Sequence, residues 1–271
     1  MDVRHLESIA STVATEAAEL IRGSAMELED LAEGTRWKSS NVDPVTVVDE
    51  ASERFISDRL ARLRPRDGLR GEEGSTRDSD SGVTWVVDPI DGTVNFLYGQ
   101  PAYAVSIAAR VEGRVLAGAV VDVVGGVLYA ASIGNGAWRQ IPGQEPERMY
   151  VRDASDLQTS LVATGFSYDA VRRGHQAKLL TRVLPQVRDI RRLGSAALDL
   201  CMLAAGQVDA YYEHGLNAWD FAAGALIAQQ AGAVVYTPST DAPSAAGWPV
   251  RACVPGIADD FLELVPATPI P

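Results

Sequence analysis

Lysine and cysteine are both scarce in this chain of 271 residues. Of the 24 basic residues only Lys38 and Lys178 are lysines, and the others are arginines. The two cysteines, Cys201 and Cys253, are too few for a disulfide framework or a cysteine metal site. This cysteine usage predicts a protein of the reducing cytoplasm.

Long apolar runs are also missing. The most apolar segment, Phe221–Tyr236, is interrupted by Gln229 and Gln230 and is shorter than the roughly 20 residues that span a bilayer. The first seven residues include acidic residues and no apolar segment of the kind found in a secretory signal. The sequence therefore predicts no association with a membrane.

Positive charge is in deficit: 36 acidic residues against 24 basic ones give a net charge of −12. Such a chain repels a phosphate backbone, so nucleic acid is not expected as a partner, whereas cations are. The hydrophobic content of 46% and the charged content of 22% exclude a chain that is disordered throughout.

The spacing of apolar residues predicts both helices and strands. Residues Glu33–Pro44 and Arg64–Gly82 are expected to be mostly loop, and the apolar run Val83–Val87 is expected to end abruptly at Asp88-Pro89. The predicted helices are His5–Leu31, Asp49–Leu63, Val171–Leu184, Ser195–Ala205 and Ala218–Gln230. The predicted strands are Val83–Val87, Ala102–Val111, Arg114–Val123, Gly126–Ala131 and Val208–Tyr212, with shorter ones near Leu161, Ile190, Val234 and Ala252. The pattern indicates a layered α+β protein that forms one domain over residues 1–271, with halves of about 1–150 and 151–271.

Several acidic residues stand at the ends of predicted elements. Glu72 and Glu73 lie between glycines in a loop, Asp88 and Asp91 directly follow an apolar strand, and Asp220 lies in the first turn of an apolar helix. Each fragment alone has an ordinary explanation: an Asp-Gly turn, a helix cap or a solvated acidic pair. Together they predict a site for a hard divalent cation such as Mg²⁺, because converging carboxylates repel one another unless cations lie between them.

The segment after Asp91 adds a second feature. Gly92 and Thr93 begin a predicted helix whose free N–H groups could face a phosphate. Acidic residues and a helix start within six residues indicate phosphoryl chemistry.

These motifs resemble the inositol monophosphatase family, the Mg²⁺-dependent, lithium-sensitive phosphatases. The resemblance is carried, in order along the chain, by Lys38-Ser39-Ser40 with Asp43–Asp49, Gly71-Glu72-Glu73, Trp85–Phe96, Arg191–Ala197 and Trp219–Gly224. It implies an αβαβα layered sandwich of the inositol monophosphatase and fructose-1,6-bisphosphatase type, a homodimer, and a site holding two or three Mg²⁺ ions.

The resemblance also implies a role for individual residues. The first Mg²⁺ would be held by Glu72, Asp88 and the carbonyl of Ile90, and the second by Asp88, Asp91 and Asp220. Thr93 and Asp49 would orient and deprotonate the attacking water, Glu72 would help to hold a third ion, and Lys38 would be the lysine of a mobile loop. The phosphate would meet the backbone of Gly92 and Thr93, and the pocket for the sugar alcohol would be lined by Gly194, Ser195, Ala196 and Glu213.

The substrate is less closely defined than the chemistry. Asp209–Glu213 matches the branch of the family that acts on inositol phosphates, in which the glutamate accepts hydrogen bonds from ring hydroxyls. The expected substrate is therefore inositol 1-phosphate or a related phosphorylated polyol. Histidinol phosphate is the rival, because the same carboxylate could bind its amine. A binding partner of the transcription machinery is the alternative that is not an enzyme.

Overall fold

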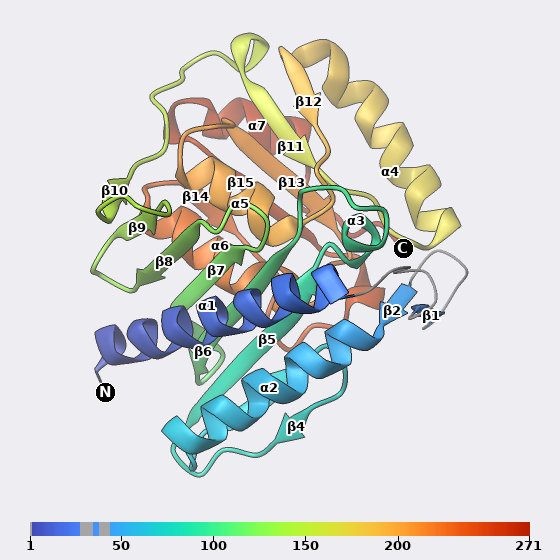
Figure 1. Ribbon diagram of the computed structural model, residues 1–271. Coiled ribbons are helices and arrows are strands. Elements are labelled where there is room, and N and C mark those ends of the chain that lie inside the picture. Colours follow the sequence, from blue (N-terminus) through green and yellow to red (C-terminus); the bar gives the residue numbers. More distant parts are fainter. Residues whose placement is uncertain (1, 28–34, 38–43) are drawn as a thin grey trace.

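The computed structural model describes residues 2–27, 35–37 and 44–271, and its helices and sheets are stacked in layers (Figure 1). Helices α1 (Val3–Glu27) and α2 (Val47–Leu63) cover one face of a large sheet. Helices α5 (Ala196–Ala204) and α6 (Ala218–Gln230) lie between this sheet and a smaller one, against which α4 (Ala170–Val183) and α7 (Ala258–Leu264) pack. The predicted αβαβα order of layers is confirmed.

The large sheet has eight strands in the order β10-β9-β8-β7-β6-β5-β3-β4. All neighbours are antiparallel except β3 and β5, which run parallel. Its strands are β3 (Gly68–Gly71), β4 (Thr76–Arg77), β5 (Val83–Asp91), β6 (Ala104–Val111), β7 (Arg114–Asp122), β8 (Leu128–Ser132), β9 (Ala137–Gln140) and β10 (Glu147–Met149). The predicted hairpin between β6 and β7 is confirmed, and its turn residues Glu112 and Gly113 both have positive φ, as a two-residue hairpin requires.

The small sheet has five strands in the order β12-β11-β13-β15-β14. Strand β11 is parallel to β12 and β13, and the other pairs are antiparallel. Its strands are β11 (Leu161–Thr164), β12 (Asp189–Arg191), β13 (Ala210–His214), β14 (Val234–Tyr236) and β15 (Pro249–Cys253). A separate two-stranded ribbon pairs β1 (Thr35–Trp37) with β2 (Pro44–Thr46), and short 3-10 turns lie at Leu157–Thr159, Leu184–Gln186, Ser244–Ala246 and Pro255–Ile257.

Helix α6 fits between the two sheets because small residues line its contacts. A Cβ on Gly118 of β7 would come within 3.0 Å of Ala223 Cα, and a Cβ on Gly224 within 2.9 Å of Leu200 Cβ in α5. One buried hydrophobic cluster includes residues of β5, β7, α5, α6 and the small sheet. We infer from this shared core that the two halves fold as one domain.

One sequence prediction is wrong in this region. The strand that was expected to stop at Asp88-Pro89 continues as β5 to Asp91, because a bulge accommodates the proline. The segment Arg64–Gly82 is mostly loop, as predicted, although the sequence did not indicate the short strands β3 and β4 within it. The part of the first predicted helix beyond Glu27 lies outside the described residues, and no described helix is both long and apolar enough to cross a membrane.

Candidate active site

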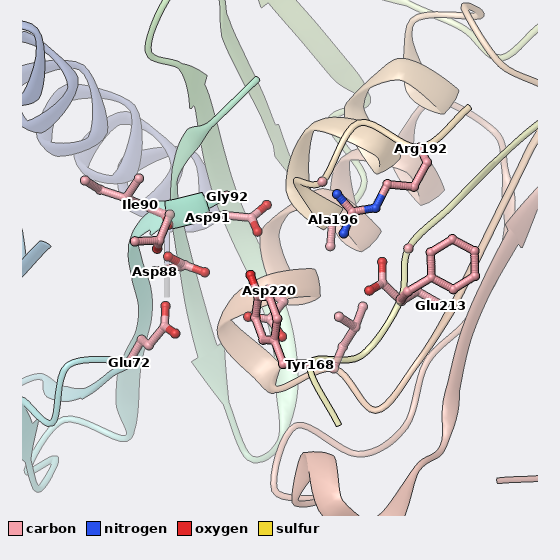
Figure 2. A pocket seen from close by; sticks show the side chains of 15 residues that line it. Glu72, Asp88, Ile90, Asp91, Gly92, Tyr168, Arg192, Ala196, Glu213 and Asp220 are labelled. Carbon is pink, nitrogen blue, oxygen red and sulfur yellow. The ribbon is translucent and has the colours of Figure 1, made fainter. Parts of the chain in front are cut away.

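A pocket lies where the end of β5 meets the starts of α5 and α6 (Figure 2). It brings together most of the residues that the sequence singled out, although they come from separate parts of the chain. Its lining consists of Glu72, Asp88, Ile90, Asp91, Gly92, Thr93, Gly165, Phe166, Tyr168, Arg192, Gly194, Ala196, Glu213, Leu216 and Asp220.

The end of β5 is bent by a bulge. Asp88 pairs with Ser106 and Asp91 with Ala104, so Pro89 and Ile90 together lie opposite one residue of β6. Proline has no N–H to donate to the neighbouring strand, which favours such an irregularity. The carbonyl of Ile90 accepts a hydrogen bond from Thr93 Oγ1 at 3.0 Å, which ties the bulge to the start of α3 (Thr93–Leu97).

Asp88 is the most deeply buried acid of the pocket, with 1% of its surface exposed. Burial raises the pKa of its carboxyl well above the usual value, and the charge of Glu72 raises it further, as do the charges of the other pocket aspartates. Its Oδ1 has no hydrogen-bond partner among the described residues. A buried carboxylate oxygen without a donor is costly, so the site suits a bound cation.

Asp91 lies against the beginning of α5. Its Oδ2 accepts hydrogen bonds from Ser195 Oγ at 2.6 Å and from the Ala197 amide at 2.7 Å. Burial raises the pKa of Asp91 to about 6, although these hydrogen bonds lower it. Ser195 does not line the pocket: it is buried behind Asp91 and caps α5 by accepting the Leu198 amide at 3.3 Å.

Asp220 lies in the first turn of α6 and helps to cap the N-terminus of that helix. The Asn217 amide donates to its Oδ2 at 2.7 Å. Burial raises the pKa of Asp220 well above the usual value, and the charges of Glu72 and Asp91 raise it further. Carboxylates near helix N-termini are favourable, so α5 and α6 each stabilise one acid of the pocket.

The segment that follows Asp91 requires glycine. Gly92 has a φ of 101°, in the left-handed region, and a Cβ there would come within 2.9 Å of the Ala102 carbonyl. Asn95 holds the same segment from the other side, because its Nδ2 donates to the carbonyls of Ala102 at 2.6 Å and Leu193 at 2.7 Å. Gly92, Thr93 and Gly194 are therefore fixed next to one another at the pocket.

Glu213 reaches the pocket from β13. Tyr211 donates its hydroxyl proton to Glu213 Oε2 at 2.9 Å, yet burial raises the pKa of the carboxyl to about 7. A Cβ on Gly165 would overlap this carboxylate, so Glu213 occupies the space that a side chain at position 165 would fill. The sequence indicated no role for residues 164–168, whereas this close approach and the pocket lining both place Gly165 at the site.

Not every predicted site residue lines the pocket. Asp49 is fully buried in the first turn of α2 and is absent from the lining, and Lys38 lies outside the described residues. Conversely, sequence reasoning missed Glu53, whose buried carboxylate accepts the amides of Glu73 at 2.7 Å and Ser75 at 2.8 Å and so holds the loop of Glu72. It also missed Arg192 and Tyr168, which line the pocket. Their spacing in the chain carries no signal, because both lie in loops.

The donor set suits a hard cation, since it consists of carboxylates and a backbone carbonyl. Among the described residues, however, no three acidic, histidine or cysteine side chains are arranged as a ready metal-binding cluster. The donor chemistry of the pocket nevertheless fits a metal ion.

Comparison with known proteins identifies the family. The model described as "Inositol monophosphatase family" matches residues 2–258. The inositol-1-monophosphatase of Mycobacterium leprae is 51% identical over 273 residues, which cover 96% of this chain and 93% of that protein. The protein named Nus factor SuhB of Escherichia coli K12 is 40% identical over 230 residues, covering 84% of this chain and 83% of that protein.

A solved structure leads to the same family. Mycobacterium tuberculosis SuhB matches with a TM-score of 0.84 and 48% identity, over 97% of this chain and 96% of that one. Members of this family are phosphatases that generally depend on a metal ion, in agreement with the donor chemistry of the pocket. The chain belongs to the inositol monophosphatase family, as its motifs predicted.

Proposed function

We propose that this protein is a Mg²⁺-dependent phosphomonoesterase that hydrolyses inositol 1-phosphate and related sugar-alcohol phosphates. The observation that carries the proposal is the convergence of Glu72, Asp88, Asp91 and Asp220 on one pocket, beside the start of α3, in a chain of this family. The proposed product is the free polyol and inorganic phosphate.

The proposed ligands divide the four acids between two ions. Glu72, Asp88 and the Ile90 carbonyl would hold one Mg²⁺, and Asp88, Asp91 and Asp220 the other, with Glu72 also helping to hold a third. When bound, the ions would supply activation of water and neutralisation of the phosphate charge. The raised pKa of Asp88 supports this division, because a carboxyl that resists ionisation in isolation gains most from a neighbouring cation.

The remaining steps belong to the protein's own groups. The Thr93 hydroxyl would orient the attacking water, and Asp49 would accept the proton. The backbone of Gly92 and Thr93 would receive the phosphate, and Glu213 would accept hydrogen bonds from hydroxyls of the leaving alcohol. The contact of Thr93 Oγ1 with the Ile90 carbonyl supports its role, since it fixes the hydroxyl beside a proposed metal ligand. The role of Lys38 remains a prediction from the sequence.

A substrate panel tests the proposal directly. Inositol 1-phosphate, histidinol phosphate, fructose 1,6-bisphosphate and 3′-phosphoadenosine nucleotides would be compared with and without Mg²⁺, using phosphate release as the readout. We expect Mg²⁺-dependent turnover that is fastest on inositol 1-phosphate. Faster turnover of histidinol phosphate would assign Glu213 to an amine instead, and turnover that survives chelation of Mg²⁺ would contradict the metal-dependent mechanism.

The name of the Escherichia coli relative favours a second candidate, a role in transcription complexes. The two functions can be separated with Asp88→Asn, which should abolish hydrolysis while leaving the outer surface unchanged. If this variant still bound transcription proteins, the second role would be independent of catalysis.

We also propose a homodimer in the cytoplasm. Light scattering tests the proposed dimer. The two free, buried cysteines support the proposed location in the cytoplasm.

A further inference from the structure

Among the described residues that line the pocket, Arg192 is the only lysine, arginine or histidine. It stands in the loop between β12 and α5, directly before Leu193, whose carbonyl is held by Asn95 at 2.7 Å. In Figure 2 its guanidinium and the carboxylate of Glu213 lie on the same side of the pocket, away from Asp88 and Glu72. The pocket therefore has an acidic end and a second end that carries one charge of each sign.

Both charged groups of this second end lie over glycines. A Cβ on Gly194 would come within 2.6 Å of Arg192 Nη1, just as a Cβ on Gly165 would overlap the Glu213 carboxylate. Gly194 also has a φ of 95°, which disfavours any other residue there. The absence of a Cβ at Gly165 and Gly194 thus leaves room for the two charged side chains.

Arg192 has no ion pair or hydrogen bond to another residue in the described part of the chain, even though acids lie near it. Its charge lowers the pKa values of Glu213 and of Asp199, a buried residue of α5, so both lie close enough to feel it. A guanidinium offers a planar set of N–H donors, and a carboxylate offers only acceptors. On the same side of the pocket, the two groups complement neighbouring hydroxyl groups, of which one accepts and the other donates.

We propose that Arg192 is a specificity-determining residue that acts with Glu213 to hold adjacent hydroxyl groups of the leaving alcohol. This inference rests on the proposed phosphatase function and narrows its substrate class to esters of polyols with adjacent free hydroxyls. The opposite charges of Arg192 and Glu213 offset each other, so this end of the pocket attracts a neutral polyol better than a second phosphate.

Steady-state kinetics of Arg192→Met test the proposal. With inositol 1-phosphate we expect KM to rise roughly ten- to a hundred-fold, the scale of one lost charge-assisted hydrogen bond, while kcat stays within a few-fold. Glycerol 2-phosphate, which is too small to span both groups, should show little change. Arg191→Met is the matched control, because Arg191 is a neighbouring exposed arginine that pairs with Asp189 at 2.8 Å and does not line the pocket.

A double-mutant cycle then asks whether the two groups act on the same substrate. If they do, Arg192→Met combined with Glu213→Gln should lose less in kcat/KM than the product of the two single losses. Independent losses would contradict the proposal that Arg192 and Glu213 act together on the substrate.

Other results would also overturn the proposal. An equal loss on both substrates, or a change of molecular mass in light scattering, would make Arg192 a structural or interface residue. A larger loss on fructose 1,6-bisphosphate than on inositol 1-phosphate would mean that Arg192 binds an anion. If the wild type hydrolyses inositol 1-phosphate and Arg192→Met is unaffected, only this inference fails, whereas an inactive wild type removes the proposed function as well.

Discussion

Ser195→Ala should weaken metal binding without impairing recognition of the substrate. The resemblance to known phosphatases assigned Ser195 to the sugar-alcohol pocket, but the residue is 1% exposed and lies behind Asp91. Its hydroxyl donates to Asp91 Oδ2 at 2.6 Å and accepts the Leu198 amide at 3.3 Å. The alanine variant therefore removes one hydrogen bond from a proposed metal ligand and one cap from α5.

The two lost contacts have separate expected magnitudes. Removal of a group that orients a metal ligand typically lowers metal affinity about 10- to 100-fold. Loss of a serine helix cap costs about 1 kcal/mol, which corresponds to a fall in Tm of roughly 2–4 °C for a large domain. The Mg²⁺ concentration that gives half-maximal activity should rise accordingly, whereas KM for inositol 1-phosphate at saturating Mg²⁺ should stay within a few-fold.

Calorimetric titration with Mg²⁺ and kinetics at saturating Mg²⁺ distinguish the two roles. Ser195→Thr is the control, because it keeps the hydroxyl and should retain most of the affinity. An unchanged affinity for Mg²⁺ together with a raised KM would refute the reasoning and would indicate that Ser195 takes part in substrate binding.

Four further outcomes are expected. Asp88→Asn should raise the Tm of the metal-free protein, because it removes a buried charge among repelling acids, and should abolish Mg²⁺-dependent turnover; a tenth or more of the wild-type rate would contradict the bridging role. Thr93→Ala should lower kcat roughly 10²-fold with Mg²⁺ affinity changed only a few-fold, and calorimetry that showed no Mg²⁺ binding would make Thr93 structural. Gly165→Ala should displace the Glu213 carboxylate and raise KM for inositol 1-phosphate but not for glycerol 2-phosphate, which kinetics on both substrates will check. Finally, the pKa of Glu213 in the folded protein is about 7, against a usual value of 4.5. The metal-free wild type should therefore lose stability relative to Glu213→Gln as the pH rises from about 4.5 through 7. Parallel curves of unfolding free energy against pH for the two proteins would rule this out.

Elements with a strong local pattern were predictable from the sequence. The apolar residues of α1, such as Leu6, Val13 and Ile21, are spaced for one helix face, and that face is buried against the large sheet. Strand β3 was missed because Gly68–Gly71 has no alternation of apolar and polar residues, and its pairing with β5 is not local. The continuation of β5 past Asp88 was missed because a proline ordinarily ends a strand, and only the partner strand accommodates the bulge.

The candidate site was predictable where residue type alone defines the chemistry. Acids at the ends of elements indicated the pocket residues Asp88, Asp91 and Asp220, which the fold brings together. The approach of Glu213 to Gly165 was not predictable, since it depends on a side chain far away in the sequence that occupies the place of the missing Cβ. The role of Ser195 depends in the same way on a contact between β5 and α5.

The surroundings of the pocket aspartates differ in a way that bears on the proposed metal site. Asp91 accepts an amide at the start of α5 and Asp220 accepts one at the start of α6, so the positive ends of two helices offset part of their charge. Asp88 lies at the end of a strand, has no such helix, and leaves its buried Oδ1 without a hydrogen-bond partner among the described residues. Of these three aspartates, the one with the least compensation from the protein is therefore the one proposed to bridge both ions. Cations between the acids would supply at Asp88 what the helices supply at the other two, which explains why a buried, repelled carboxylate can stand at the centre of the site.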